Sequence, residues 1–167
     1  MSSHPHLVHE PSLPWTEVTQ GPRVSYRRKQ LGAAAKGQKL GCSLMELAPG
    51  KHAFPLHFHL ANEEAYFILS GTGRLRLGDT TLSVKAGDYV ALPVGPTGAH
   101  QLVNDGAETL RYLAFSTMVE PDVMVYPDSK KLCITAGSAP GGDKAARTLY
   151  TVLPLSAEVD YWSGEER

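Results

Sequence analysis

The sequence has little cysteine, no long apolar run and no block of charge of one sign, and each absence excludes a class of protein. Its two cysteines, Cys42 and Cys133, give neither a disulfide framework nor a CxxC zinc signature, so we expect free thiols. No apolar segment approaches the roughly 20 residues that a membrane-spanning helix needs. The N-terminal stretch has no positive n-region and no apolar h-region, so we expect no secretory signal and a cytoplasmic location.

Basic and acidic residues are nearly balanced, at 16 and 17, and the formal net charge is −1. The densest basic run, RRK at 27–29, is too short for a nucleic-acid track, and we expect a solvated stretch before the first strand. We therefore expect neither nucleic-acid nor membrane partners. A chain of 167 residues with 42% hydrophobic and 20% charged residues is typical of one soluble globular domain.

Helical periodicity is scarce, and short β-like runs separated by turn residues fill the stretch 39–116. The connections are too short for helical crossovers, so the sheets should be antiparallel. Closing or doubling such a sheet removes most exposed edges, which predicts an all-β barrel or jelly roll. The expected strands lie at 39–47, 52–59, 64–70, 74–77, 81–84, 89–93, 100–104 and 109–116, with a hairpin turn at Gly78-Asp79.

The flanks, residues 1–38 and 117–167, are less regular and richer in proline and glycine than the core at 39–116. We interpret them as an N-terminal arm and a C-terminal extension that pack on the core or on a second subunit, not as separate domains. Ala65, Phe67 and Leu69 form an apolar outer face that needs a cover. A homodimer is therefore expected.

The stretch HFHLANEE places two histidines immediately before a pair of glutamates. On a strand, alternate side chains share a face, so His57 and His59 can converge on one ion, whereas on a helix they cannot. A turn follows, and Glu63 or Glu64 opens the next strand beside them. His100 begins a later strand and can supply a third imidazole. The alternative is a set of surface or core histidines with unrelated partners.

This pattern continues into a longer one that resembles the cupin superfamily. The first cupin motif corresponds to GKHAFPLHFHLANEEAYFILSG at 50–71, and the second to GDYVALPVGPTGAHQLVN at 87–104. Two spacings depart slightly from the usual pattern. Six residues lie between Gly50 and His57, where five are usual, and four lie between Gly95 and His100, where two are usual. Both departures fall in turns.

The resemblance implies a cupin jelly-roll β-barrel, also called a double-stranded β-helix, with one divalent metal bound by His57, His59, Glu64 and His100. The motif spacing selects Glu64 over Glu63. The flanks resemble a group of small single-domain bacterial cupins of the cupin 2 type, some of which carry a sugar-phosphate isomerase label. The ligand set suits Fe, Mn, Ni, Co, Cu or Zn.

Two functions remain open at this point. The first is a metal-dependent enzyme, with oxygenase or isomerase-like chemistry, that acts on a small polar oxygen-bearing molecule. The second is a non-catalytic protein that binds a small molecule or a metal.

The cavity should be lined by residues that share a face with the ligands. Alternation from Glu64 turns Tyr66 and Ile68 inward, and alternation from His100 turns Leu102 inward, so these three are candidates for substrate binding.

Tyr66 is also a candidate proton donor, or else a packed core tyrosine. His52 is a candidate acid or base, or else a surface-loop histidine. A phosphate substrate would need a cationic clamp. Arg74 and Arg76 alternate with leucines and should face solvent. Arg111 and Lys51 remain possible, but no pair points clearly at the metal.

Overall fold

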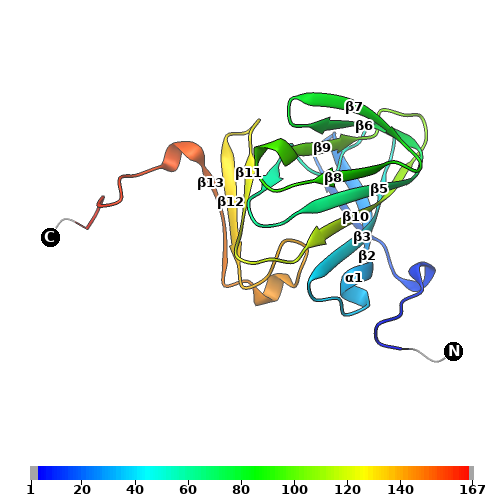
Figure 1. Ribbon diagram of the computed structural model, residues 1–167, viewed down its shortest axis with the longest axis horizontal. Coiled ribbons are helices and arrows are strands. Elements are labelled where there is room, and N and C mark those ends of the chain that lie inside the picture. Colours follow the sequence, from blue (N-terminus) through cyan, green and yellow to red (C-terminus); the bar gives the residue numbers. More distant parts are fainter. Residues whose placement is uncertain (1–3, 166–167) are drawn as a thin grey trace.

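The chain folds into three antiparallel sheets, and the computed structural model describes residues 4–165 (Figure 1). Short helical turns join the strands at α1 (Leu31–Ala34), η1 (Glu10–Ser12), η2 (Pro96–Gly98), η3 (Lys144–Ala146) and η4 (Leu155–Ala157). The six-stranded sheet has the order β1 (Thr16–Gln20), β2 (Val24–Gln30), β3 (Leu40–Leu47), β10 (Leu110–Thr117), β5 (Glu64–Ser70) and β8 (Tyr89–Leu92).

The two smaller sheets contain the remaining strands. The four-stranded sheet has the order β13 (Leu149–Pro154), β12 (Lys131–Ala136), β11 (Asp122–Tyr126) and β4 (Phe58–His59). The three-stranded sheet has the order β7 (Thr80–Lys85), β6 (Thr72–Leu77) and β9 (His100–Val103).

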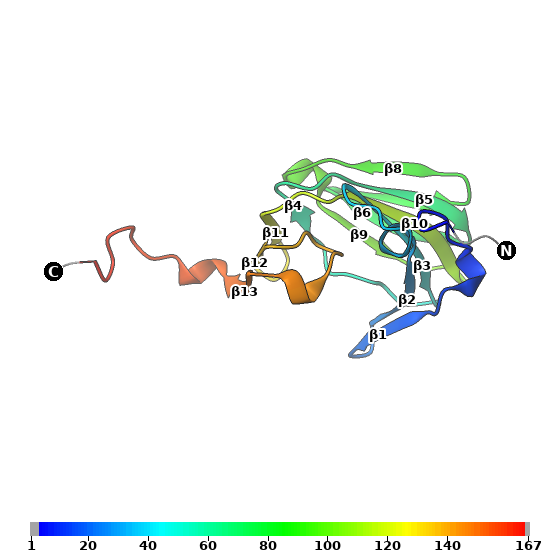
Figure 2. The ribbon, with the colours of Figure 1, turned by 90° about the horizontal axis from the view of Figure 1, so that it is seen from below.

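The predicted all-β jelly-roll architecture and its antiparallel pairing are confirmed. Strand β5 has the predicted bounds, and Leu77 pairs with Thr80 across the predicted turn at Gly78-Asp79. The sheets wrap around a common interior (Figure 2). However, no ladder among residues 4–165 closes them into one continuous barrel. Isolated bridges, His57 to His100 and His52 to Val103, join segments of the wall instead.

The predicted strand at 52–59 is mostly irregular, and only Phe58–His59 forms a strand. Conversely, β1 and β2 lie in the N-terminal flank, and β11, β12 and β13 lie in the C-terminal flank, where no strands were predicted. These segments carry charges or prolines that obscure a simple alternation. Their strand structure depends on neighbours far away in the sequence, as when β2 pairs with β3.

The main core lies between the sheets and follows strand alternation. Tyr66 and Ile68 of β5 point into it, and Phe67 and Leu69 of the same strand are exposed. The exposed pair belongs to the apolar face on which the expected homodimer rests, and the dimer stays a prediction. The other buried members of this core are Met45, Leu47, Ala53, Leu75, Val84, Leu92, Leu102, Leu110 and Tyr112.

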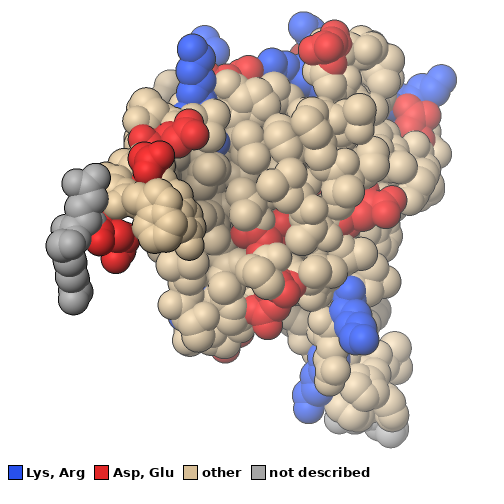
Figure 3. Space-filling view, turned by 60° about the vertical axis from the view of Figure 1, so that its left-hand side comes forward, with Lys and Arg blue, Asp and Glu red and all other residues tan. Residues whose placement is uncertain are grey.

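The chain after β13 leaves the body of the molecule (Figures 1 and 2). It carries exposed Val159, Tyr161 and Trp162. In Figure 3, lysine and arginine lie toward the margins of the face at this end, and most of its surface is uncharged. Among the described residues, no helix has the length and apolar character required to cross a membrane.

Asn104 holds together the end of the sheets opposite the C-terminal strands. Its side-chain amide donates to the carbonyl oxygens of Leu47 (2.7 Å) and Glu108 (2.8 Å), and its Oδ1 accepts from the amide of Gly106 (3.0 Å). Asn104 is fully buried, so water cannot replace these bonds. The last residue of the second motif is therefore structural.

Replacing Asn104 with alanine should lower the free energy of unfolding by about 3 kcal/mol, because the buried carbonyl of Leu47 and the carbonyl of Glu108 lose their donor. Urea unfolding followed by fluorescence measures this change. The exposed amide of Gln20 provides the control, and Gln20→Ala should stay within about 0.5 kcal/mol of the wild type. Equal stability of the two variants would contradict the structural role of Asn104.

Candidate metal centre

A reciprocal backbone bridge places His57 opposite His100. The amide of His57 donates to the carbonyl of His100 (3.2 Å), and the amide of His100 donates to the carbonyl of His57 (2.8 Å). The two rings lie with their centroids 4.5 Å apart. His59 follows two residues later and turns to the same side, and Phe58 between them packs against Leu56 and Ala99 in a separate cluster.

Glu64 completes the group from the first position of β5. Its Oε2 lies 3.2 Å from Nε2 of His100 and 3.8 Å from Nε2 of His59. The ligand atoms of His57, His59 and Glu64 all lie within 4.8 Å of one another. Neighbouring Glu63 is exposed. The structure thus brings together the three imidazoles and the one carboxylate that the motifs single out.

The second nitrogen of each imidazole is held by an acceptor outside the group. Nδ1 of His57 lies 2.9 Å from the carbonyl oxygen of Pro55, and Nδ1 of His100 lies 2.8 Å from that of Gly98. Since a carbonyl can only accept, these Nδ1 atoms carry the hydrogen and each Nε2 keeps its lone pair. The rings are therefore oriented as metal ligands are.

His59 is held by a carboxylate instead of a carbonyl. Its Nδ1 lies 2.5 Å from Oδ2 of Asp122, which is almost fully buried at 1% exposure. The other oxygen of Asp122 accepts from the amide of Ala61 (2.9 Å). Sequence reasoning missed Asp122, because a single aspartate at the start of the segment DVMVY gives no local signal. Its role depends on the pairing of β11 with β4.

The buried Nε2 of His100 has no hydrogen-bond partner among residues 4–165. The nearby Glu64 oxygen is close enough for a hydrogen bond, but the pair does not have hydrogen-bond geometry. A buried nitrogen left unpaired is costly, and a cation shared with Glu64 would satisfy both atoms. The donor set of three nitrogens and one carboxylate fits a divalent transition metal.

Charges within the group favour neutral imidazole at His57. Its pKa falls to about 4, because burial disfavours the imidazolium and His100 lies close by. For His59, burial acts to lower the pKa, but the hydrogen bond to Asp122 and the charge of Glu64 outweigh burial and raise the pKa. Burial likewise acts to raise the pKa of Glu64, and the surrounding histidines lower it. A proton therefore competes with a metal more strongly at His59 than at His57.

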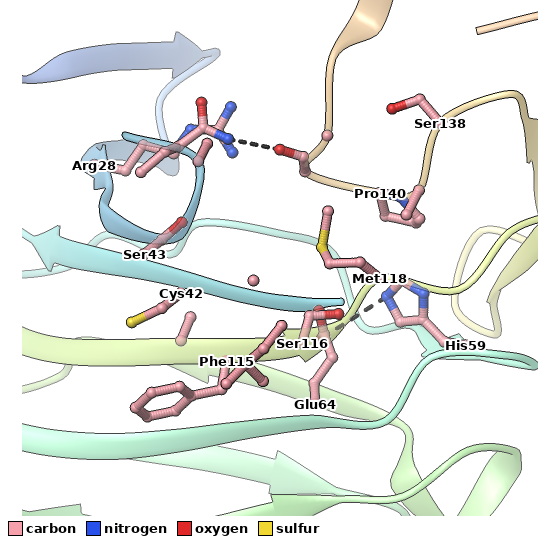
Figure 4. A pocket seen from close by; sticks show the side chains of 18 of the residues that line it. Arg28, Cys42, Ser43, His59, Glu64, Phe115, Ser116, Met118, Ser138 and Pro140 are labelled. Atoms are coloured by element: carbon pink, nitrogen blue, oxygen red, sulfur yellow. Dashed lines mark hydrogen bonds and ion pairs between the residues drawn. The ribbon is translucent and has the colours of Figure 1, made fainter. Parts of the chain in front are cut away.

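A cavity of about 620 Å³ opens against His57, His59 and Glu64, which form part of its wall. Figure 4 shows Glu64 and His59 projecting into this space, with Met118 and Ser116 nearby. Its wall is mixed, with polar and apolar residues from six strands, β2, β3, β4, β5, β10 and β11, and from the loop at 137–143. Other residues of the wall are Arg28, Gln30, Ser43, Met45, Met124 and Tyr126.

The remaining predicted site residues separate into two groups. Tyr66 lines the cavity, and its ring lies edge-on to His100. Burial raises the pKa of Tyr66 well above its usual value, so the phenol keeps its proton. Ile68 and Leu102 instead belong to the main core and are not part of the cavity wall. Both point inward as expected, but they pack in the core.

His52 lies outside the cavity wall. It forms isolated bridges with Val24 and Val103, and its Nδ1 lies 3.2 Å from the carbonyl of Phe54 and 3.0 Å from Nε2 of Gln101. The structure therefore gives His52 a place in the wall of the fold, away from the metal ligands.

Arg28 corrects the expectation of a solvated RRK stretch. It pairs with Met45, whose side chain lies in the core, and it lines the cavity. Strand alternation along VSYRRKQ places Arg28 on the opposite face from Arg27 and Lys29. This prediction is possible only once the segment is known to be a strand.

The comparisons with known proteins agree with this architecture. The family model for the cupin domain matches residues 43–116. An uncharacterized protein of Methanocaldococcus jannaschii, MJ1618, is 38% identical over 61 residues, which cover 36% of this chain and 47% of that protein. The chain thus matches less than half the length of this curated relative.

Solved structures match more of the chain. A proposed sugar phosphate isomerase from Acidithiobacillus ferrooxidans superposes with a TM-score of 0.78 at 25% identity, covering 93% of this chain and 96% of that one. A cupin sugar phosphate isomerase from Silicibacter pomeroyi gives 0.75 at 18% identity, covering 90% and 94%. A predicted oxalate decarboxylase from Thermotoga maritima gives 0.59 at 24% identity, covering 68% and 99%. Residues 43–116 therefore match the cupin 2 family, and the chain shares its fold with solved cupin proteins.

Proposed function

We propose that the protein is a metal-dependent enzyme that acts on a small polar oxygen-bearing molecule. The observation that supports the proposal is the convergence of His57, His59 and Glu64 at the wall of a cavity, with Nε2 of His100 lying 3.2 Å from Oε2 of Glu64. His57, His59, Glu64 and His100 would hold the ion. The names of the solved neighbours, two sugar phosphate isomerases and an oxalate decarboxylase, support small oxygen-rich substrates.

A divalent ion bound there would polarise a carbonyl or carboxylate of the substrate or, if redox-active, activate dioxygen. The chain supplies the surroundings for this chemistry. Met45 and Met124 give the cavity apolar surface that excludes water from the reacting groups. Tyr66 holds a proton at its hydroxyl and can donate a hydrogen bond to a substrate oxygen.

The metal assignment predicts that His57→Ala combined with His59→Ala abolishes specific metal binding. After removal of metal and controlled reloading with Zn(II), Ni(II), Mn(II) or anaerobic Fe(II), content should fall from about one ion per chain to below about a tenth. Elemental analysis measures this content.

The chain contains its own matched control, because His4 and His6 have the same spacing on an exposed segment. The variant His4→Ala with His6→Ala should retain full loading. Unchanged metal content in the His57 and His59 variant would place the metal elsewhere.

The catalytic part of the proposal predicts that turnover depends on one metal and on Glu64. Each reloaded form is screened against sugars, sugar phosphates, thiols and organic acids for product or oxygen uptake. Glu64→Ala should reduce the rate by at least about a hundredfold, because it removes a metal ligand, whereas Glu63→Ala should leave the rate near that of the wild type. Saturable ligand binding without turnover in any form would instead support a non-catalytic binding protein.

Asp122 should tune metal affinity without touching the metal. Asp122→Asn keeps the shape of the side chain but supplies one acceptor where His59 and the Ala61 amide need two. Zn(II) affinity, measured by competition with a chelator, should fall about tenfold or more. Asp105→Asn, at an aspartate paired on the surface with Arg74, is the control. Equal affinity in both variants would show that the His59–Asp122 hydrogen bond does not support the metal centre.

A further inference from the structure

Three consecutive basic residues on β2 have different environments. Arg27 pairs with Glu46 (2.6 Å) and Lys29 pairs with Glu10 (2.7 Å), both on the outer face of the sheet. The side chain of Arg28 points to the inner face and forms no ion pair or hydrogen bond with any residue in 4–165. Its Nε is buried without a partner. The cavity thus contains an uncompensated guanidinium.

The acidic side chains of the cavity wall do not neutralise Arg28. Glu64 is turned toward His59 and His100. Asp143 accepts a hydrogen bond from the amide of Ala145 (2.9 Å), and Glu120 forms no ion pair with Arg28. Leaving a partly buried cation unpaired is costly unless a ligand of opposite charge occupies the space beside it.

The position of Arg28 suits a ligand that also reaches the metal centre. Across the inner face of the six-stranded sheet, β2 is separated from β5 by β3 and β10. Three interstrand spacings place the two backbones about 14 Å apart, so side chains from both can reach one small molecule between them. Figure 4 shows Arg28 across the cavity from Glu64 and His59, with Ser43 between them in this view.

The loop at 137–143 covers the cavity at the Arg28 end. Nε2 of Gln30, on the same face of β2 as Arg28, donates to the carbonyl of Gly141 (2.7 Å) and fixes the loop there. Ser138 of this loop and Ser43 of β3 add hydroxyl groups to the cavity wall, and in Figure 4 Ser43 lies on the side of Arg28. Hydroxyl and guanidinium groups can both donate hydrogen bonds to an oxyanion.

We propose that Arg28 binds an anionic oxygen group of the substrate, a carboxylate or a phosphate, while another part of the substrate reaches the metal centre. The planar guanidinium can donate two parallel hydrogen bonds to such a group. This inference rests on the proposed function for its second anchor, but the anion site at Arg28 is built from the chain alone. It makes Arg28 a residue that determines substrate specificity.

The test uses three probes of similar size, glycerol 3-phosphate, glycerate and glycerol, titrated by calorimetry into zinc-loaded and metal-free protein. Both anions should bind more tightly than glycerol, and the tighter of the two identifies phosphate or carboxylate as the preferred group. Arg28→Gln should weaken anion binding about tenfold or more in both forms. Arg27→Gln, one residue away on the outer face, should leave it unchanged.

A second measurement uses only the wild-type protein, so it does not depend on whether Arg28→Gln folds. In the wild-type protein, the Nε–H resonance of Arg28 should shift on titration with the anion that binds more tightly, and should stay in place with glycerol. The proposal is overturned if glycerol binds as tightly as the anions, if Arg28→Gln binds them like the wild type, or if this resonance does not move.

The two proposals fail in different ways. If His57 and His59 prove not to bind the metal, the metal-free protein should still bind the anions. Conversely, a metal-dependent activity that is equal in the wild type and in Arg28→Gln, for charged and neutral substrates alike, would remove Arg28 from recognition and leave the metal centre standing.

Discussion

The pair of backbone hydrogen bonds between His57 and His100 is the contact on which the rest of the site depends. The two residues lie 43 positions apart, and although His100 begins β9, which pairs with β6, His57 lies outside the strands and is held by this bridge. Their reciprocal bridge sets the distance between the two rings, and the Nδ1 contacts to Pro55 and Gly98 then set the ring orientations. Backbone pairing therefore determines where the side-chain nitrogens meet.

The flanks outside the cupin domain complete this centre. The family model covers 43–116, yet Asp122, which orients His59, lies after it, and Arg28 lies before it. The loop at 137–143 covers the cavity from the same C-terminal flank. The cupin domain contains His57, His59, Glu64 and His100, and the flanks add Arg28, Asp122 and the loop at 137–143 around them.

Sequence reasoning was most successful where the signal is local. The HxH spacing predicted that His57 and His59 share a face, the resemblance to cupins selected Glu64 over Glu63, and alternation from Glu64 predicted an inward Tyr66. The structure places these four residues around one cavity.

The misses have a common physical cause. Ile68 and Leu102 point inward but contact the core, since facing inward does not decide which layer of the interior a side chain reaches. Arg28 and Asp122 acquire their roles from the pairings β2–β3 and β4–β11, which join distant segments. No local pattern reports such pairings.

The candidate ligands also differ in the sheet from which they come. His59 belongs to the four-stranded sheet, Glu64 to the six-stranded sheet and His100 to the three-stranded sheet. No ladder closes these sheets and only isolated bridges join them, so a shared ion would add a cross-link among the three sheets. The free energy of metal binding would then add to the free energy of folding. Loss of the metal would therefore lower the stability of the fold as well as the activity.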